Sequence, residues 1–319
     1  MTTDSSLAYF TRALPGTMAI AVVGFALNAL VFITMARFLN PANFGNLKVA
    51  ASTMLVASVA VGLGGSRAAG RFLPRRIKGS SAATGYIGFY VRTIVSLSLL
   101  LAGGLWIVVL LLPGDLPEDI HGHHPVSFVV LLVPVWAGLD LLSQVYMVTR
   151  RPILAALPTR FVFPIVGLGF IWWAHATGIH LSDVMFVLVL SGAGLATLLV
   201  FAAILWGLEA KDGPEDEDAE NSTGETQTGP RDWMALSLPM VGAGLVVILV
   251  AEVPLFALAF AGDEAEIGLY GAAITLTQIF LIVITCQRQI YGPAMGKLLA
   301  EGIETTRVLH AHAQRQAVL

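Results

Sequence analysis

The chain has 319 residues, of which 56% are hydrophobic and 12% are charged, with a formal net charge of -3 and a mean hydropathy of +0.79. A soluble domain cannot hide this much apolar surface, so the composition excludes a soluble protein and predicts a membrane protein. The single cysteine, Cys286, excludes an internal disulfide and a cysteine-based metal site.

Eight apolar runs are long enough to cross roughly 30 Å of hydrocarbon as helices, which takes about 20 residues each. They cover residues 14–36, 47–66, 85–112, 126–148, 161–178, 183–207, 235–260 and 268–290. Each run is too long for a strand of a membrane barrel, and none alternates as a barrel strand does. We therefore predict an all-α fold, a polytopic membrane helix bundle of about eight transmembrane helices.

The joints between the runs predict the orientation, because basic residues near span ends are retained on the cytoplasmic side. One alternate set of joints carries most of the basic residues: Arg12, Arg67, Arg71, Arg75, Arg76, Lys78, Arg150, Arg151, Arg160, Lys211, Arg231, Arg288, Lys297, Arg307 and Arg315. The other set holds only Arg37 and Lys48. This asymmetry predicts a multi-pass protein of the cytoplasmic membrane with both termini in the cytoplasm.

Two segments of the chain resemble each other at a spacing of about 223 residues. A proline-opened apolar run, a polar turn ending in Gly45 and a second apolar run recur around Gly268, and 268 minus 45 is 223. Because six runs precede the second segment, both copies have the same orientation, which is typical of a parallel repeat. The sequence thus predicts a six-span first lobe and the start of a second lobe.

Composition divides the chain into three parts. Residues 1–207 are predicted to form the first six-helix transmembrane lobe. Residues 208–232 are rich in Asp, Glu, Gly, Pro, Ser and Thr and are predicted to be a disordered, acidic cytoplasmic linker. Residues 233–319 are predicted to be a partial second lobe with two transmembrane helices and a cytoplasmic tail helix, which a partner chain or a dimer would complete.

Four short motifs follow one another in an order typical of one transporter family. Residues 38–45 read F-L-N-P-A-N-F-G, and Gly62-Leu63 precedes the segment 71–74, R-F-L-P. Residues 233–239 read W-M-A-L-S-L-P, and 267–273 read I-G-L-Y-G-A-A. Together these motifs resemble those of the polysaccharide biosynthesis flippases, a branch of the multidrug/oligosaccharidyl-lipid/polysaccharide exporter superfamily.

This resemblance implies a two-lobed carrier that moves a polyprenyl-linked saccharide from the cytoplasmic to the outer leaflet during cell-surface glycan synthesis. It also implies a cationic cavity between the lobes for the lipid phosphate. Because arginine presents several donors at fixed geometry, basic residues inside or at the ends of spans are the candidate phosphate ligands. These candidates are Arg37, Arg67, Arg92 and Arg288, of which Arg92 and Arg288 are expected to draw the phosphate inward.

Two carboxylates lie inside predicted spans, Asp140 in the fourth and Glu252 in the seventh. Either could bind a coupling proton or cation, and either could instead hold helices together through a hydrogen bond or ion pair. His121, His123 and His124 lie with acidic residues in an outer joint, where a solvated loop is a better interpretation than a metal site. We therefore expect no metal and no cofactor.

Three functions remain compatible with the sequence. The first is a flippase for lipid-linked saccharides, and the second is a cation-coupled exporter of small organic cations. The second would be favoured if Glu252 and Asp140 faced one cavity whose walls lacked arginine. The third is a truncated, non-transporting membrane protein or a scaffold for saccharide assembly. We expect no enzyme, because no nucleophile with a base and no paired carboxylates gather at one surface, and no nucleic-acid partner.

Overall fold

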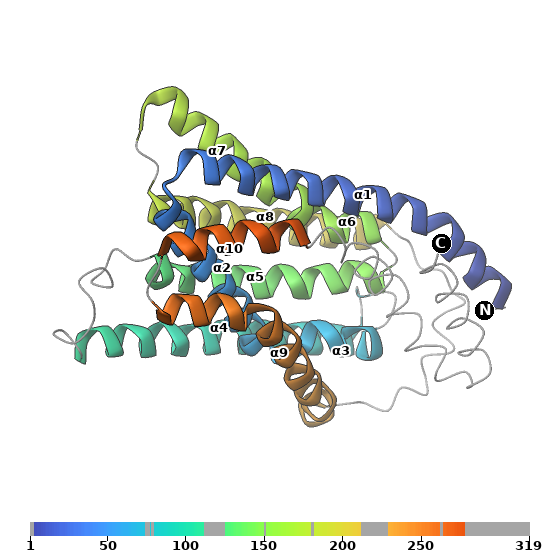
Figure 1. Ribbon diagram of the computed structural model, residues 1–319. Coiled ribbons are helices and arrows are strands. Elements are labelled where there is room, and N and C mark those ends of the chain that lie inside the picture. The colour runs from blue at the N-terminus through green and yellow to red at the C-terminus, as the bar shows by residue number, and fades with distance from the viewer. Residues whose placement is uncertain are drawn as a thin grey trace.

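A computed structural model describes residues 3–73, 77, 80–111, 125–149, 151–179, 182–211, 229–261 and 264–277. Within these ranges every regular element is a helix, and the long helices lie side by side in one bundle (Figure 1). In chain order they are α1 (Thr3–Phe38), α2 (Pro41–Val61), α3 (Gly65–Phe72), α4 (Ser81–Leu111), α5 (Pro125–Val148), α6 (Pro152–Leu157), the π-helical segment η2 (Pro158–Val162), α7 (Phe163–Thr177), α8 (Asp183–Lys211), α9 (Pro230–Ala261) and α10 (Glu264–Thr277).

Seven helical stretches in the described part of the chain are long and apolar enough to cross a membrane. They confirm the prediction of an all-α, polytopic membrane bundle. The eighth predicted span, 268–290, begins within α10, but its residues beyond Thr277 lie outside the described ranges. The predicted linker is bounded by the end of α8 at Lys211 and the start of α9 at Pro230, and most of it also lies outside these ranges.

The predicted span starts that differ most from the structure are those of the second and fifth spans, and local chemistry explains both. The second span begins at Pro41 and not at residue 47, because the Asn40 side chain accepts a hydrogen bond of 2.7 Å from the Asn43 amide and proline favours the first helical position. The fifth span begins at Pro152 and not at residue 161, because α6, η2 and α7 follow one another without a break. Proline inside such a stretch favours local π-type adjustment over a full stop.

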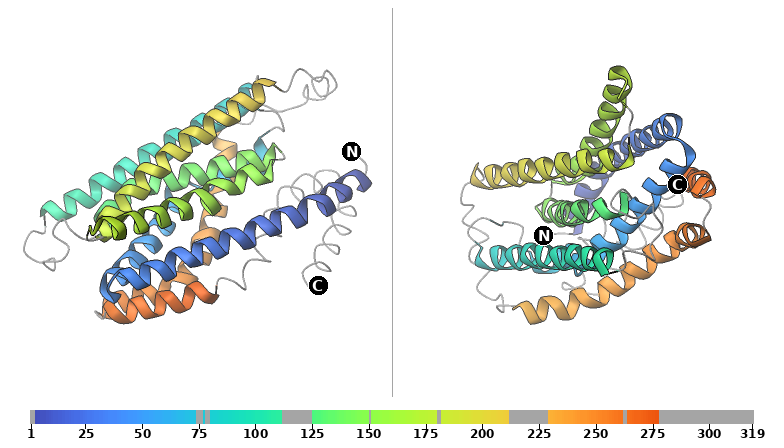
Figure 2. Two further views of the ribbon diagram at one scale, coloured as in Figure 1. Left: turned by 90° about the horizontal axis from the view of Figure 1, so that it is seen from above. Right: turned by 90° about the vertical axis from the view of Figure 1, so that its left-hand side faces the viewer.

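Helices α2 and α5 form the centre of the bundle. Half of an apolar 18-residue stretch of α2 and 44% of such a stretch of α5 are buried, whereas only 17% of such a stretch of α4 and 11% of one of α9 are buried. Helix α9 crosses the other long helices at a steep angle (Figure 2) and presents an exposed apolar face that includes Val246, Val247 and Val250. Such a face is expected for a helix in contact with lipid or with further apolar helices.

A glycine turn between α2 and α3 brings these two helices close to α9. Gly64 has a positive φ of 69°, which favours glycine, and any β-carbon there would collide with the Ser237 carbonyl of α9. A β-carbon on Gly65 would likewise collide with the ring of Tyr90 in α4. The turn therefore serves close helix packing.

Two buried tyrosines of α4 complete this junction. The Tyr86 hydroxyl donates to the Gly65 carbonyl at 2.7 Å, and the Tyr90 hydroxyl donates to Ser237 Oγ at 2.9 Å. Trp233, at the start of α9, packs edge-on against Tyr86 with ring centroids 5.3 Å apart. The start of α9 is thus fixed to α3 and α4 by hydrogen bonds and by aromatic contacts.

Replacing Tyr90 with phenylalanine is expected to destabilise the protein by about 1–2 kcal/mol, because the fully buried Ser237 hydroxyl loses its partner. The thermal unfolding midpoint in detergent measures this loss. Tyr90→Phe combined with Ser237→Ala should cost less than the sum of the two single changes. Additive losses would show that the two hydroxyls do not interact.

Candidate functional site

A pocket lies where α2, α3, α4 and α5 meet. Its polar lining consists of Ser58, Ser66, Arg67 and Asp140, and its apolar lining includes Ile94, Ala137 and Leu141. Arg67 and Asp140, two of the residues predicted individually from the sequence, are thus brought to the same pocket. Charged groups within membrane-spanning helices are costly and tend to face a cavity or a partner, so this pocket is the candidate site.

The position of Arg67 is determined by a close approach to α9. Its Nη1 donates to the Met240 carbonyl at 2.8 Å, so α3 and α9 are joined by a charge-assisted hydrogen bond. Gly244 makes this approach possible, because a β-carbon at that position would overlap the Arg67 guanidinium. Arg67 therefore lines the pocket, and its guanidinium lies against the backbone of α9.

Asp140 reaches the pocket from the central helix α5 and has an exposed side chain. Pro134 lies six positions earlier in the same helix and removes one backbone hydrogen bond there. A carboxylate beside an arginine and two serine hydroxyls can exchange a proton or compete with an anionic ligand for the guanidinium. This chemistry suits a site that binds and releases an anion.

A second polar cluster lies between α2 and α9 and consists of Lys48, Ser52 and Glu252. The Ser52 hydroxyl donates to Glu252 Oε2 at 2.6 Å, and the Glu252 carboxylate acts electrostatically on Lys48. Lys48 is only 8% exposed, and its Nζ lies 3.5 Å from the centroid of the Phe32 ring. Lys48 and Ser52 are four residues apart, so one face of α2 presents both to Glu252.

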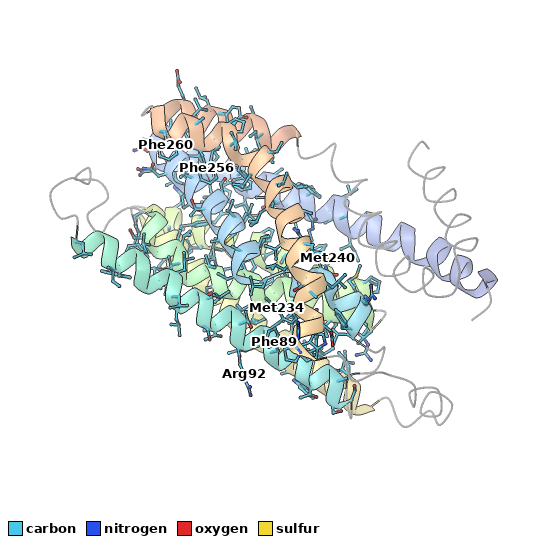
Figure 3. The ribbon with its side chains drawn as sticks, turned by 90° about the horizontal axis from the view of Figure 1, so that it is seen from below. Phe89, Arg92, Met234, Met240, Phe256 and Phe260 are labelled. Carbon is cyan, nitrogen blue, oxygen red and sulfur yellow. The ribbon has the colours of Figure 1, made fainter. Side chains whose placement is uncertain are left out.

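Those of the remaining predicted residues that the structure describes lie apart from the pocket. Arg92 is exposed on α4 and points away from the bundle (Figure 3). Arg37 is exposed in the last turn of α1, and Glu252 belongs to the second cluster. Arg288 and the histidines at 121, 123 and 124 lie outside the described residues. Among the residues that the structure does describe, no group of three His, Cys, Asp or Glu side chains is arranged to hold a metal.

The sequence did not predict a role for Lys48 or Gly244. Lys48 had been counted with the joint because it stood at the edge of the predicted span 47–66, whereas it lies seven residues beyond Pro41, about 10 Å along the helix at 1.5 Å per residue. The Asn40-Pro41 pair is the signal that could have placed it inside the span. Gly244 lies in an apolar run that carries no local indication of its contact with Arg67.

The helices and the two polar clusters define a multi-pass helical membrane protein. No protein-family model, no curated protein and no solved structure matches this chain.

Proposed function

We propose that the chain is a membrane transporter that flips a polyprenyl-linked saccharide across the cytoplasmic membrane. The observation that supports this proposal best is the position of Arg67. Arg67 lines a pocket within the helical bundle, and its guanidinium binds the backbone of α9, the first helix of the predicted second copy. A phosphate that engaged this guanidinium would act on the contact between the two copies.

The chemistry of the pocket supports an anionic ligand. Arginine binds phosphate oxygens through several donors, and the Ser66 hydroxyl can donate a further hydrogen bond, whereas the Ser58 hydroxyl donates to the Leu55 carbonyl at 2.9 Å. In the proposed mechanism the phosphate displaces the guanidinium from the Met240 carbonyl, and Asp140 takes up the proton that balances the added charge. The released α9 then moves relative to α3, which gives alternating access. The choice of a lipid-linked saccharide rests on the motif resemblance.

The alternative of a cation-coupled exporter receives less support. That function would be favoured by Glu252 and Asp140 facing one cavity without arginine. The pocket at Asp140 has Arg67 in its wall, and Glu252 does not line that pocket. Glu252 instead accepts a hydrogen bond from Ser52 beside the Lys48 ammonium, so a positive charge already lies next to this carboxylate.

Purified protein in liposomes tests the proposal directly. The liposomes carry a polyprenyl diphosphate linked to a sugar with a fluorophore that external dithionite reduces. The protein is expected to expose the inner-leaflet label to dithionite, and Arg67→Ala is expected to slow this exposure by about tenfold or more, because the guanidinium–phosphate pair is lost.

Arg71→Ala is the matched control, because Arg71 lies one turn further along α3 and is exposed. This variant should retain the rate of the wild-type protein. A wild-type rate equal to that of protein-free liposomes would contradict the proposed transport and favour the scaffold. Uptake of a fluorescent organic cation driven by a proton gradient, without saccharide flipping, would favour the exporter.

A further inference from the structure

The helix pair α1–α2 packs against the helix pair α9–α10, and we call this contact the inter-copy interface. Helix α2 contacts both α9 and α10, and α10 contacts both α1 and α2. Two glycines of α10 allow the close approach. A β-carbon on Gly268 would lie 2.6 Å from the Pro41 carbonyl oxygen, and one on Gly271 would lie 2.8 Å from Lys48 Cγ.

Positions that correspond in the two predicted copies meet at this interface. Gly45 corresponds to Gly268 at the spacing of 223, and the Gly268 β-carbon position lies 3.6 Å from the Gly45 amide nitrogen. Lys48 corresponds to Gly271 at the same spacing, because 271 minus 48 is also 223, and these two residues are in contact. In a two-fold contact between like surfaces, equivalent positions face each other along the axis. The α1–α2 pair therefore receives α9–α10 in the way that it would receive a second α1–α2 pair.

Three residues make the α1–α2 face unlike the α9–α10 face near the axis that relates the two copies. Lys48 is buried, and its stem lies against Gly271, where a side chain would leave no room for it. Glu252 supplies a negative charge beside the ammonium and is itself held by the Ser52 hydroxyl. The first-copy position that corresponds to Glu252 is Ala29, because 252 minus 223 is 29, and it carries no charge.

We propose that Lys48, Glu252 and Gly271 are specificity determinants of the inter-copy interface, and that they make the α1–α2 face bind α9–α10 and reject a second α1–α2 face. Two α1–α2 faces on one axis would bring Lys48 of one chain against Lys48 of another. Neither of these two α1–α2 faces would place a carboxylate or a glycine beside the lysines, because Glu252 and Gly271 belong to α9–α10. Burying two like charges without partners is strongly unfavourable, and specificity of this kind arises from a penalty on the wrong partner.

The first experiment measures the pairing within the intact chain. A site for a sequence-specific protease is inserted between Lys211 and Pro230, the folded protein is cut in the membrane, and a tag on the N-terminal part is used for capture in mild detergent. The wild-type C-terminal part should be retained. Lys48→Glu and Glu252→Lys are each expected to reduce its retention by about tenfold or more, and the double exchange should restore it, because breaking a buried pair is costly and exchanging it is not.

Arg71→Glu reverses an exposed charge outside the inter-copy interface and should leave retention unchanged. The double exchange also excludes general misfolding as the cause of a loss, because a misfolded chain is not repaired by a second reversal. The proposed pairing would be overturned if neither single reversal lowered retention of the C-terminal part. It would also be overturned if the double exchange retained no more of the C-terminal part than either single change.

The second experiment measures rejection of a second α1–α2 face. Cut chains with two different tags are mixed, and capture of one N-terminal part by the other is measured. Glu252→Ala leaves Lys48 in place and should give background capture, whereas Glu252→Ala combined with Lys48→Gly should raise capture by about tenfold, because the like-charge contact is removed. If the two variants gave equal capture, at background or above it, the proposal that Lys48 makes the interface reject a second α1–α2 face would be overturned.

Discussion

Gly244→Ala is expected to expel the Arg67 guanidinium from its place on α9. The added methyl would occupy the position of the guanidinium, so the end of the Arg67 side chain has to move away from α9. Arg67 would lose its hydrogen bond to the Met240 carbonyl and leave a charge without that partner inside the bundle. We expect a loss of about 2–3 kcal/mol in the free energy of unfolding, measured by thermal unfolding in detergent, together with loss of flipping in liposomes.

Gly242→Ala is the matched control, because it makes the same chemical change two residues earlier in α9, where no atom lies within 4 Å of the new methyl. This variant should be as stable as the wild type or more stable, since alanine favours a helix over glycine by about 1 kcal/mol. Combining Gly244→Ala with Arg67→Ala should cost less than the sum of the two changes. Full additivity would show that Gly244 does not act through Arg67.

The apolar runs predicted the fold because a bilayer leaves few alternatives. A run of about 20 apolar residues must satisfy its own backbone, so length and hydropathy are enough to predict a helix. Boundaries depend on finer chemistry. The start of α2 is determined by the Asn40 cap and Pro41, and the fifth span continues through Pro158 by means of a π-helical segment. Neither feature changes hydropathy, so hydropathy alone could not locate these boundaries.

The candidate site could be predicted only as separate residues. Arg67 and Asp140 were each recognisable as charges at or within spans, but their shared pocket depends on how α3 packs against α5. Arg92 was predicted on the same grounds and points away from the bundle, because which face of a long apolar helix is inward depends on its neighbours. Helix α4 is apolar on nearly all sides, so its sequence does not indicate an inward face.

The contact between Arg67 and Met240 links the turn at Leu63 and Gly64 to the pocket that Arg67 lines. Arg67 is the third residue of α3, and α3 begins directly after Gly64. The positive φ of Gly64, together with a φ of 41° at Leu63, turns the chain from α2 into α3. The direction of this turn determines whether Arg67 faces α9. The conformation of two residues is therefore coupled to the position of the only arginine that lines the described pocket.

Gly64→Ala is accordingly expected to disturb both the fold and the site. An alanine at a φ of 69° costs about 1–2 kcal/mol in backbone strain, and its methyl would collide with the Ser237 carbonyl. Since the collision is with backbone, either α3 or α9 has to move. We expect a total loss of about 3 kcal/mol or more in the free energy of unfolding, again from thermal unfolding in detergent.

Gly104→Ala provides the comparison for this change, because Gly104 lies in α4 with no atom within 4 Å of a new methyl. It should leave stability unchanged or raise it slightly. A cysteine placed at Ser66 offers a readout of the site, in a Cys286→Ser background, through its rate of labelling by a maleimide. Gly64→Ala should change this rate because movement of α3 opens or closes the pocket at Ser66, and Gly104→Ala should not. Unchanged labelling and stability in Gly64→Ala would mean that the turn tolerates a side chain and does not position Arg67.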